Sequence, residues 1–286
     1  GFEADEVRIF GKMYKNGHIY KGLKPVYWCA KDETALAEAE IEYQDDPCTT
    51  VYVKFPMKDD LGKLGHLDLS KLSFVIWTTT IWTLPGNLAI ALHPDEAYAV
   101  VKAPNGEMYI MAEALTEKVM KIGGFDSYEI VETHPGRFFE NMLAQHPFLD
   151  KTSRLLLADY VTMDSGTGCV HTAPGFGADD YQTCMRYGME MVVPVDDQGR
   201  HTEYAGKYAG LKTDESNPII LNDMKESGAL FASEEIIHSY PHCWRCKSPI
   251  IFRATPQWFC SVDSFKDEAI AACENVRWLP AWGKDR

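Results

Sequence analysis

The segment from Gly166 to Tyr181 joins a short strand, a glycine-rich turn and the acidic start of a helix within sixteen residues. Its four glycines allow left-handed backbone angles or a close approach between the backbone and a ligand. Asp179 and Asp180 stand where the helix is expected to begin. Two interpretations stay open: an aspartate that caps the helix and stabilises it by about 1 kcal/mol, or a carboxylate that is brought to the edge of a pocket.

Alternating apolar residues predict a fold that is built mainly from strands. After position 48, short segments with a two-residue period follow one another, and fewer stretches have helical spacing. The expected strands cover 50–55, 73–77, 88–92, 97–101, 108–111 and 250–253, and the expected helices cover 5–16, 113–122, 180–188, 215–227 and 264–273. We therefore predict an α+β fold, mainly β, with a β-barrel-like core and peripheral helices.

Changes of pattern divide the chain into three parts. Residues 1–47 are predicted to form an N-terminal helix and an extended arm, in which 33–40 is rich in helix formers. Residues 48–235 form the barrel-like core. Residues 236–286 return as a second arm with a cysteine-containing turn and a helix. We expect the two arms to pair as an extended stalk.

Composition and charge exclude several classes of protein. The chain has no apolar run of the roughly 18 residues that a membrane-spanning helix needs, and its first residues do not resemble a signal peptide. We expect a cytoplasmic protein without a membrane partner. The net charge of −14 argues against unaided, non-specific binding of nucleic acid. A local basic patch on an acidic molecule can still steer such a partner.

A second motif lies at 77–87, where short polar side chains follow an apolar strand. Thr78, Thr79, Thr80, Thr83 and Asn87 stand close together in the sequence, just before and after a turn-forming proline and glycine. Three threonines in a row are also typical of an exposed strand edge. The alternative is a pocket whose hydroxyl and amide groups hydrogen-bond a sugar or an ester.

Taken together, the two motifs resemble the editing insertion (connective polypeptide 1) of isoleucyl-tRNA synthetases, which belong to the class I aminoacyl-tRNA synthetases. The resemblance covers essentially the whole chain, including the runs at 24–29, 35–40 and 252–259. The HIGH-type and KMSKS-type motifs that activate the amino acid are missing from this sequence. The resemblance therefore implies an editing domain that does not itself charge tRNA.

The implied reaction is hydrolysis of the ester of valyl-tRNA specific for isoleucine, while isoleucyl-tRNA is spared. One methylene separates the two amino acids too weakly for a single apolar pocket, a limit for which isoleucyl-tRNA synthetases are the standard example. Two alternatives from other classes are a non-catalytic module that binds the tRNA acceptor end and a zinc-stabilised interaction domain. The implied partners are the tRNA 3′ end carrying valine and the remainder of a parent synthetase, and we expect a monomer.

The resemblance also assigns roles to residues. Asp180 would accept the α-ammonium group of the substrate, and His171 would limit the size of the aminoacyl pocket. Thr79 and Thr83 would contact the terminal adenosine, the ester or the attacking water, which we expect to be positioned without a covalent intermediate. The remaining predicted substrate-binding residues are Thr78, Thr80, Trp82, Asn87, Gly168, Ala173 and Gly175.

Three positions depart from patterns of the class I editing domains. Phe176 replaces the histidine of the usual Gly-His-Gly loop, so no base or donor is expected there. Ile81 replaces the proline that usually follows the threonines. Thr80 stands where leucyl and valyl enzymes usually place an arginine, which favours the isoleucyl type.

The cysteine pattern predicts one candidate metal site. Cys243 and Cys246 have the spacing of a zinc knuckle, and a structural zinc needs four ligands. The resemblance implies that Cys29 in the N-terminal arm joins them, with Asp32 or His242 as the fourth ligand. The alternative is a turn with reduced thiols and no metal. Editing itself needs no cofactor in this interpretation.

Overall fold

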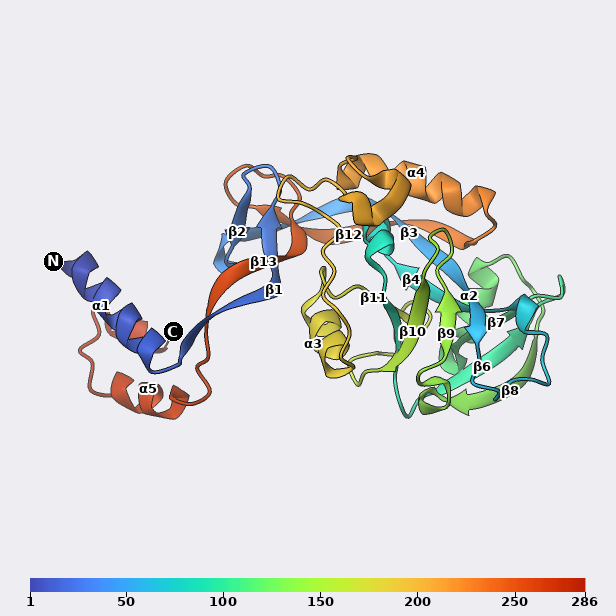
Figure 1. The fold of residues 1–286 in the computed structure, drawn as a ribbon, viewed down its shortest axis with the longest axis horizontal. Coiled ribbons are helices and arrows are strands. Elements are labelled where there is room, and N and C mark those ends of the chain that lie inside the picture. Colours follow the sequence, from blue (N-terminus) through green and yellow to red (C-terminus); the bar gives the residue numbers. More distant parts are fainter. Residues whose placement is uncertain (286) are drawn as a thin grey trace. The chain divides into compact units, whose positions relative to one another are not determined.

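The computed structural model describes residues 1–285, which fold as two compact units (Figure 1). One unit combines Gly1–Lys24 with the chain from Thr255 onward, and the other comprises Pro25–Ala254. Arg286, at the end of the predicted C-terminal arm, lies outside the described residues. The predicted boundaries at 47/48 and 235/236 lie inside the long strands β3 (Ile41–Asp59) and β12 (Leu230–Cys243).

Ten strands of the larger unit form one mixed sheet, which confirms the prediction of a mainly β fold. β3 pairs with both β9 and β4, so the pairings β3-β9-β10-β5-β11-β4 lead back to β3 within this sheet. Beyond these strands, β12 extends from β3, while β7, β6 and β8 extend from β4. The remaining strands are β4 (Leu72–Thr78), β5 (Ala89–Leu92), β6 (Ala97–Lys102), β7 (Met108–Ala112), β8 (Glu129–Pro135), β9 (Leu143–Gln145), β10 (Thr152–Leu157) and β11 (Val170–Thr172).

An almost continuous apolar sequence places β4 in the centre of the core. Phe74, Val75 and Ile76 are fully buried although they point alternately to opposite faces of the sheet. Both faces of this strand are therefore covered, as the lack of alternation in its sequence requires. Phe74 packs edge-on against Phe139, with 5.7 Å between the ring centroids, and Tyr98 meets the same ring at 6.3 Å.

Three helices cover parts of this core at positions that the sequence predicted: α2 (Thr116–Ile122), α3 (Ala178–Arg186) and α4 (Thr213–Glu226). α4 buries Ser216, Ile220 and Met224, which are spaced four residues apart and share one face. This helix packs against β12 and against η3 (Ile81–Gly86), a 3-10 helix that contains Thr83 and the turn of the threonine motif.

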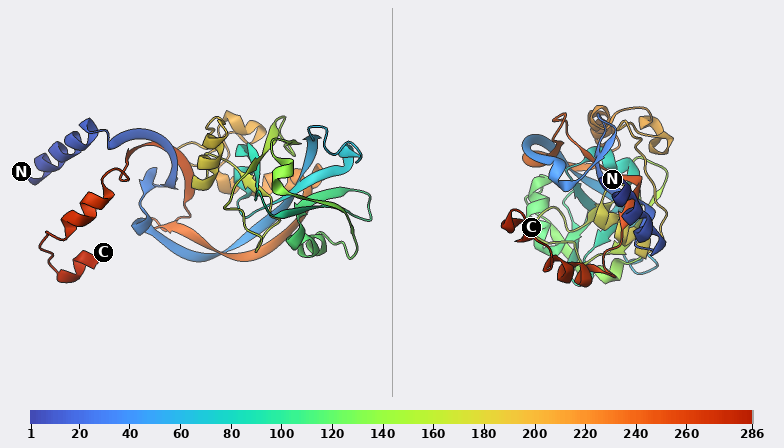
Figure 2. Two further views of the ribbon diagram at one scale, coloured as in Figure 1. Left: turned by 90° about the horizontal axis from the view of Figure 1, so that it is seen from below. Right: turned by 90° about the vertical axis from the view of Figure 1, so that its left-hand side faces the viewer.

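The longest pairing in the molecule joins β3 to β12 as an antiparallel ribbon (Figure 2). Its register runs from Val53 opposite Leu230 to Ile41 opposite Cys243. A second sheet has the strand order β13-β1-β2, made from β1 (Ile19–Cys29), β2 (Thr34–Leu36) and β13 (Ile251–Cys260). The segment 33–40 thus forms β2 and a 3-10 turn instead of a longer helix, because its pairing with β1 and the burial of Leu36 outweigh helix propensity.

The described part of the smaller unit contains two α-helices, α1 (Phe2–Lys15) and α5 (Lys266–Cys273), both predicted from the sequence. None of their residues is buried. Phe10 and Tyr14 of α1 meet the ring of Trp258 edge-on, with centroid distances of 5.5 and 6.0 Å. These aromatic contacts hold α1 against β13 within the unit.

Replacement of Phe139 by alanine tests the packing of the core. The change opens a cavity between Phe74 and Tyr98, and we expect it to lower the free energy of unfolding by about 3–5 kcal/mol in urea titrations. Ile237→Ala is the control, because Ile237 is 70% exposed, and we expect a loss of at most about 1 kcal/mol. Equal losses in the two variants would contradict this description of the core.

Candidate functional site

Parallel pairing of two strands brings the two sequence motifs together. β11 runs parallel to β4, with Val170 opposite Trp77. The carboxyl ends of parallel strands lie at the same edge of a sheet. β4 therefore leads into the threonine segment (residues 78–87) at this edge. β11 leads into the glycine loop (residues 173–177) and α3 at the same edge. Motifs about ninety residues apart in the sequence form a single site, as loops after parallel strands often do.

A chain of hydroxyl groups fixes the threonine segment. The Oγ1 atoms of Thr78 and Thr80 lie 3.2 Å apart, and those of Thr80 and Thr83 lie 3.3 Å apart. Thr83 Oγ1 donates to the Thr80 carbonyl at 2.7 Å. Thr78 and Thr83 are buried and Thr80 is partly buried, so these hydroxyls are held by packing as well as by hydrogen bonds. The strand-edge interpretation of the three threonines does not fit this arrangement.

His171 is held on both ring nitrogens. The Asn87 side-chain amide donates one N–H to the Ala89 carbonyl and the other to Nδ1 of His171, both at 2.8 Å. Since Nδ1 accepts, the ring proton is on Nε2, which donates to Thr83 Oγ1 at 3.0 Å. Burial, followed by the positive charge of Lys151, lowers the pKa of His171 to about 3. The imidazole is therefore neutral and fixed in one orientation.

Asp180 does not cap its helix. Gly177 occupies the N-cap position of α3, and Asp180 is the third helical residue. Its Oδ2 accepts the Ala173 backbone N–H at 2.9 Å, and Oδ1 has no hydrogen-bond partner among residues 1–285. A Cβ on Gly177 would lie 3.0 Å from Cγ of Asp180, so the small residue leaves space for the carboxylate.

Burial raises the pKa of Asp180 to about 6, and the neighbouring charge of Asp179 adds to this rise. The Ala173 N–H acts in the opposite direction because it stabilises the ionised form. The carboxylate is thus charged at neutral pH but poorly compensated. A cation that reached its free oxygen would supply the missing compensation.

These groups line a cavity of about 310 Å³. Of the four residues predicted to act on the substrate, all four lie in its wall. Gly168 is there too, with φ of +74° and a position where a Cβ would meet that of Ala112 at 2.4 Å. The predicted residues in the wall are Thr78, Thr79, Thr80, Thr83, Gly168, His171, Ala173 and Asp180.

Three predicted substrate-binding residues lie outside this wall. Asn87 is fully buried behind His171 and acts through it. The carbonyl of Gly175 accepts the Ala254 N–H, and a Cβ at Gly175 would lie 2.3 Å from the Val192 carbonyl oxygen, so backbone packing requires this glycine. Trp82 lines a different cavity.

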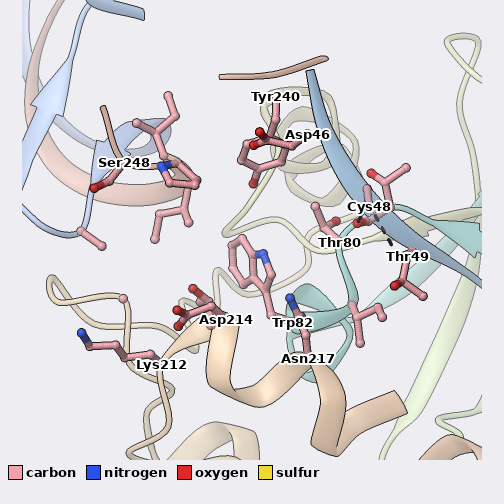
Figure 3. Close-up of a pocket in the computed structure, with 18 of the residues that line it drawn as sticks. Asp46, Cys48, Thr49, Thr80, Trp82, Lys212, Asp214, Asn217, Tyr240 and Ser248 are labelled. Carbon is pink, nitrogen blue, oxygen red and sulfur yellow. Dashed lines mark hydrogen bonds between the residues drawn. The ribbon is translucent and has the colours of Figure 1, made fainter. Parts of the chain in front are cut away.

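That second cavity has a volume of about 860 Å³ and is shared by β3, β12 and α4 (Figure 3). Trp82 extends into it beside Asp214 and Asn217 of α4 (Figure 3). Its wall carries charges of both signs, from Lys31, Glu33, Asp46, Arg200, Lys212 and Asp214. Thr79 and Thr80 belong to both cavities and separate one from the other.

Phe176 fills the place where the family pattern has a histidine. Its ring meets Trp82 edge-on, with 4.8 Å between centroids, and also lines the smaller cavity. A Cβ on Gly86 would lie 2.7 Å from the Phe176 ring. The aromatic side chain is therefore accommodated by a glycine in the threonine segment, and it offers no proton acceptor.

Sequence reasoning missed Tyr160, which lines the smaller cavity together with Asp180. Its hydroxyl is buried and has no hydrogen-bond partner in the described part of the chain. Burial, and then the charge of Asp180, raises the pKa of this phenol, so it remains a neutral donor. Tyr160 follows β10 without any motif, and no signal in the sequence indicates that it reaches the site.

The cysteine cluster lies at the base of the β3–β12 ribbon. The side-chain ligand atoms of Cys29, Asp32, Cys243 and Cys246 all lie within 4.8 Å of one another. The Sγ atoms of Cys29 and Cys246 are 3.5 Å apart, and so are Cys243 Sγ and Asp32 Oδ2. His242 is occupied elsewhere, with Asp46 at 3.2 Å from Nε2. The structure thus brings Asp32, and not His242, to the three thiols.

The family model for class I tRNA synthetases (I, L, M and V) matches residues 1–286. The chain belongs to this family. It is 53% identical over its full length to isoleucine–tRNA ligase of Caldicellulosiruptor saccharolyticus and 46% identical to that of Syntrophomonas wolfei. It spans 31% and 30% of these two relatives.

The fold also resembles that of a solved structure. A crystal structure titled "GlLeuRS-CP1" matches with a TM-score of 0.51 and 14% identity, over 65% of this chain and 99% of that one. At this identity the match shows the fold alone. Among residues 1–285, no helix is long and apolar enough to cross a membrane.

Replacement of Asn87 by alanine tests how His171 is fixed. The change removes the donor to Nδ1, so we expect a mixture of ring tautomers, seen as ¹⁵N signals of His171 that move toward each other. It also leaves the Ala89 carbonyl without its partner, and we expect a loss of about 1–3 kcal/mol in unfolding free energy. Asn222→Ala, at an exposed site on α4, should change neither quantity. Unaltered His171 signals in Asn87→Ala would contradict the assignment.

Proposed function

We propose that this chain is the post-transfer editing domain of an isoleucyl-tRNA synthetase, which hydrolyses the ester of valyl-tRNA specific for isoleucine. The observation that carries the proposal is the free carboxylate oxygen of Asp180 in a small cavity beside threonine hydroxyls and a neutral imidazole. Full-length similarity to isoleucine–tRNA ligases supports the parent enzyme, and the fold match supports an editing domain.

Asp180 is suited to bind the α-ammonium group of the aminoacyl ester. One oxygen is held by Ala173 and the other is free for a charged donor. A charge-assisted hydrogen bond in a poorly solvated place is strong, and it would lower the raised pKa of this carboxyl. The ammonium group would thereby place the ester carbonyl beside the threonines.

His171 and the threonines then act by position and not by proton abstraction. Both ring nitrogens of His171 are engaged and its pKa is lowered, so it is a poor general base. The hydroxyls of Thr79, Thr80 and Thr83 can orient the attacking water and the ester oxygen. Water adds to the carbonyl carbon, the bond to the ribose oxygen breaks, and the ribose oxygen leaves with a proton. A neighbouring ribose hydroxyl of the substrate is available to relay this proton.

The rigidity of His171 gives the cavity its selectivity. A ring that is hydrogen-bonded on both sides cannot move aside for an extra methylene. The cavity would therefore admit valine and exclude isoleucine by size, as a second sieve must. The net charge of −14 is unfavourable for tRNA. We therefore assign most of the tRNA affinity to the remainder of the parent synthetase.

The direct test is deacylation of valyl-tRNA by the chain and by an intact synthetase that contains it, with isoleucyl-tRNA in parallel. We expect valyl-tRNA to be hydrolysed and isoleucyl-tRNA to be spared. Asp180→Asn should reduce kcat/KM by at least about thirtyfold, because truncating one partner of such a pair costs about 2–5 kcal/mol. Asp179→Asn is the matched control, since Asp179 is the exposed neighbour in the same helical turn.

The pH dependence gives a second readout of Asp180. The carboxylate loses its charge as the pH falls through about 6, so kcat/KM for deacylation, which reports the free protein, should fall below this pH. Asp179→Asn should keep this fall but move it to a slightly lower pH, because the charge of Asp179 contributes to the raised pKa of Asp180. Equal hydrolysis of both esters by the intact synthetase would refute the sieve. Full activity in Asp180→Asn, with unchanged tRNA binding, would refute the role of Asp180.

We further propose that Cys29, Cys243, Cys246 and Asp32 hold a structural zinc ion. A tetrahedral site with Zn–S distances of about 2.3 Å separates its ligand atoms by roughly 3.8 Å, and two pairs in this cluster lie 3.5 Å apart. Three thiols and one carboxylate are zinc ligands. Zinc would here stabilise the turn after β12 against the turn after β1, and it takes no part in ester hydrolysis.

Metal analysis tests this site. Protein that is purified without chelator should contain zinc at about one ion per chain. Asp32→Asn should weaken zinc binding, measured by competition with a chromophoric chelator, and lower the melting temperature. His242→Asn should leave zinc affinity unchanged, because His242 pairs with Asp46 outside the cluster. Wild-type protein that stays metal-free when zinc is supplied would end the proposal.

A further inference from the structure

The hairpin loop between β9 and β10 reaches the backbone of the threonine segment. These two strands are antiparallel neighbours, with Gln145 opposite Thr152, and residues 146–151 connect them. From this loop, His146 Nε2 donates to the Leu84 carbonyl at 2.9 Å, and Lys151 Nζ donates to the Pro85 carbonyl at 2.6 Å. Two successive carbonyls of η3 are therefore held by one loop.

His146 is a permanent donor in this arrangement. Its Nδ1 accepts the backbone N–H groups of Phe148 and Leu149, at 3.3 and 3.1 Å. The ring proton is thus on Nε2, which faces Leu84. Burial lowers the pKa of His146 to about 3, so it stays neutral. The hydrogen bonds within the loop fix the orientation of the imidazole, and the imidazole in turn holds η3.

Lys151 is the second anchor. Its ammonium group is partly buried and lies 5.0 Å from the centre of the Tyr204 ring, in addition to its bond with Pro85. Burial lowers its pKa to about 8. The Gln145 amide donates to the Lys151 and Leu149 carbonyls at 2.9 and 3.2 Å, which fixes the backbone from which Lys151 extends.

The two anchored carbonyls lie between the residues that hold His171. Thr83, which receives the Nε2 proton, directly precedes Leu84, and Asn87, which donates to Nδ1, follows two residues after Pro85. We propose that His146 and Lys151 are positioning residues of the editing site, which fix the segment 83–87 so that Thr83 and Asn87 clamp the His171 ring. This inference rests on the proposed function. Neither residue lines the smaller cavity, so both act on the site through Thr83 and Asn87.

A purely structural role would have different consequences. The core of the larger unit contains many fully buried residues outside this contact, and the loss of one partly buried lysine should not unfold it. Misplacement of the clamp would instead lower the rate of the chemical step, because a small shift of positioned groups costs about tenfold to a hundredfold. Binding of the tRNA, which depends on other surfaces, should change little.

The test compares Lys151→Met and Lys151→Arg with Lys63→Met in an intact synthetase. Lys63 is a matched control, since its Nζ also donates to a backbone carbonyl, that of Phe138, and lies 5.1 Å from an aromatic ring. We expect Lys151→Met to lower kcat for valyl-tRNA deacylation at least tenfold with KM little changed. Lys151→Arg should restore most of the rate, because a guanidinium can donate to the same carbonyl.

Hydrogen exchange of backbone amides provides a readout that needs no activity. The Asn87 N–H donates to the Leu84 carbonyl at 3.0 Å, beside the Pro85 carbonyl that Lys151 holds. When Lys151→Met frees Pro85, this amide should therefore exchange faster, and it should exchange normally in Lys63→Met. Unchanged kcat in Lys151→Met would overturn the proposal, whether or not exchange became faster. If wild-type synthetase does not deacylate valyl-tRNA, the proposed function fails. Exchange then decides separately whether Lys151 holds the segment.

Discussion

The arrangement of the site depends on one pairing, the parallel contact of β4 with β11. The pairing is short, but it sets the edge at which both strands end. The threonine segment and the glycine loop leave from that edge, and the residues that meet there belong to no common stretch of sequence. His171 shows the result most directly, because its own strand carries the ring while Thr83 and Asn87 from the neighbouring segment fix it. A shift of one residue in this register would turn His171 to the other face.

Much of the fold follows from local patterns, and the parts that do not are set by distant pairings. The sequence predicts strands such as β4 and β7 because each is a short run of mostly apolar residues between turn-forming segments. β12 was missed because its sequence is polar and its burial is only partial. It is extended because β3, almost two hundred residues earlier in the chain, supplies its partner. The segment 33–40 has helix formers but is partly a strand for a different reason, because Thr34–Leu36 pairs with the end of β1 a few residues earlier.

The site was predictable to the extent that motifs mark it. Asp180, His171 and the threonines stand in recognisable runs, and they do meet around one cavity. The sequence could not distinguish a residue that faces the cavity from one that supports it, so Asn87 and Gly175 were assigned to the substrate although they act on the protein. Tyr160 and Lys151 lie beyond the reach of such reasoning, because a lone tyrosine or lysine in a connecting loop carries no pattern. Only three-dimensional packing places them.

The cysteine cluster has a consequence for how the larger unit unfolds. Cys29 and Cys246 are in contact although they are 217 residues apart in the sequence. A bridge between Cys29 and Cys246, either a shared ion or a covalent link, would close the chain from 29 to 246 into one loop that contains the whole core. Such a closure removes entropy from the unfolded chain, by an amount that grows with the logarithm of the loop length. The closed loop contains the whole core, so this entropy loss stabilises the folded core against complete unfolding. Tension on the two chain segments that enter and leave the core would then act on the bridge and would not reach the smaller cavity.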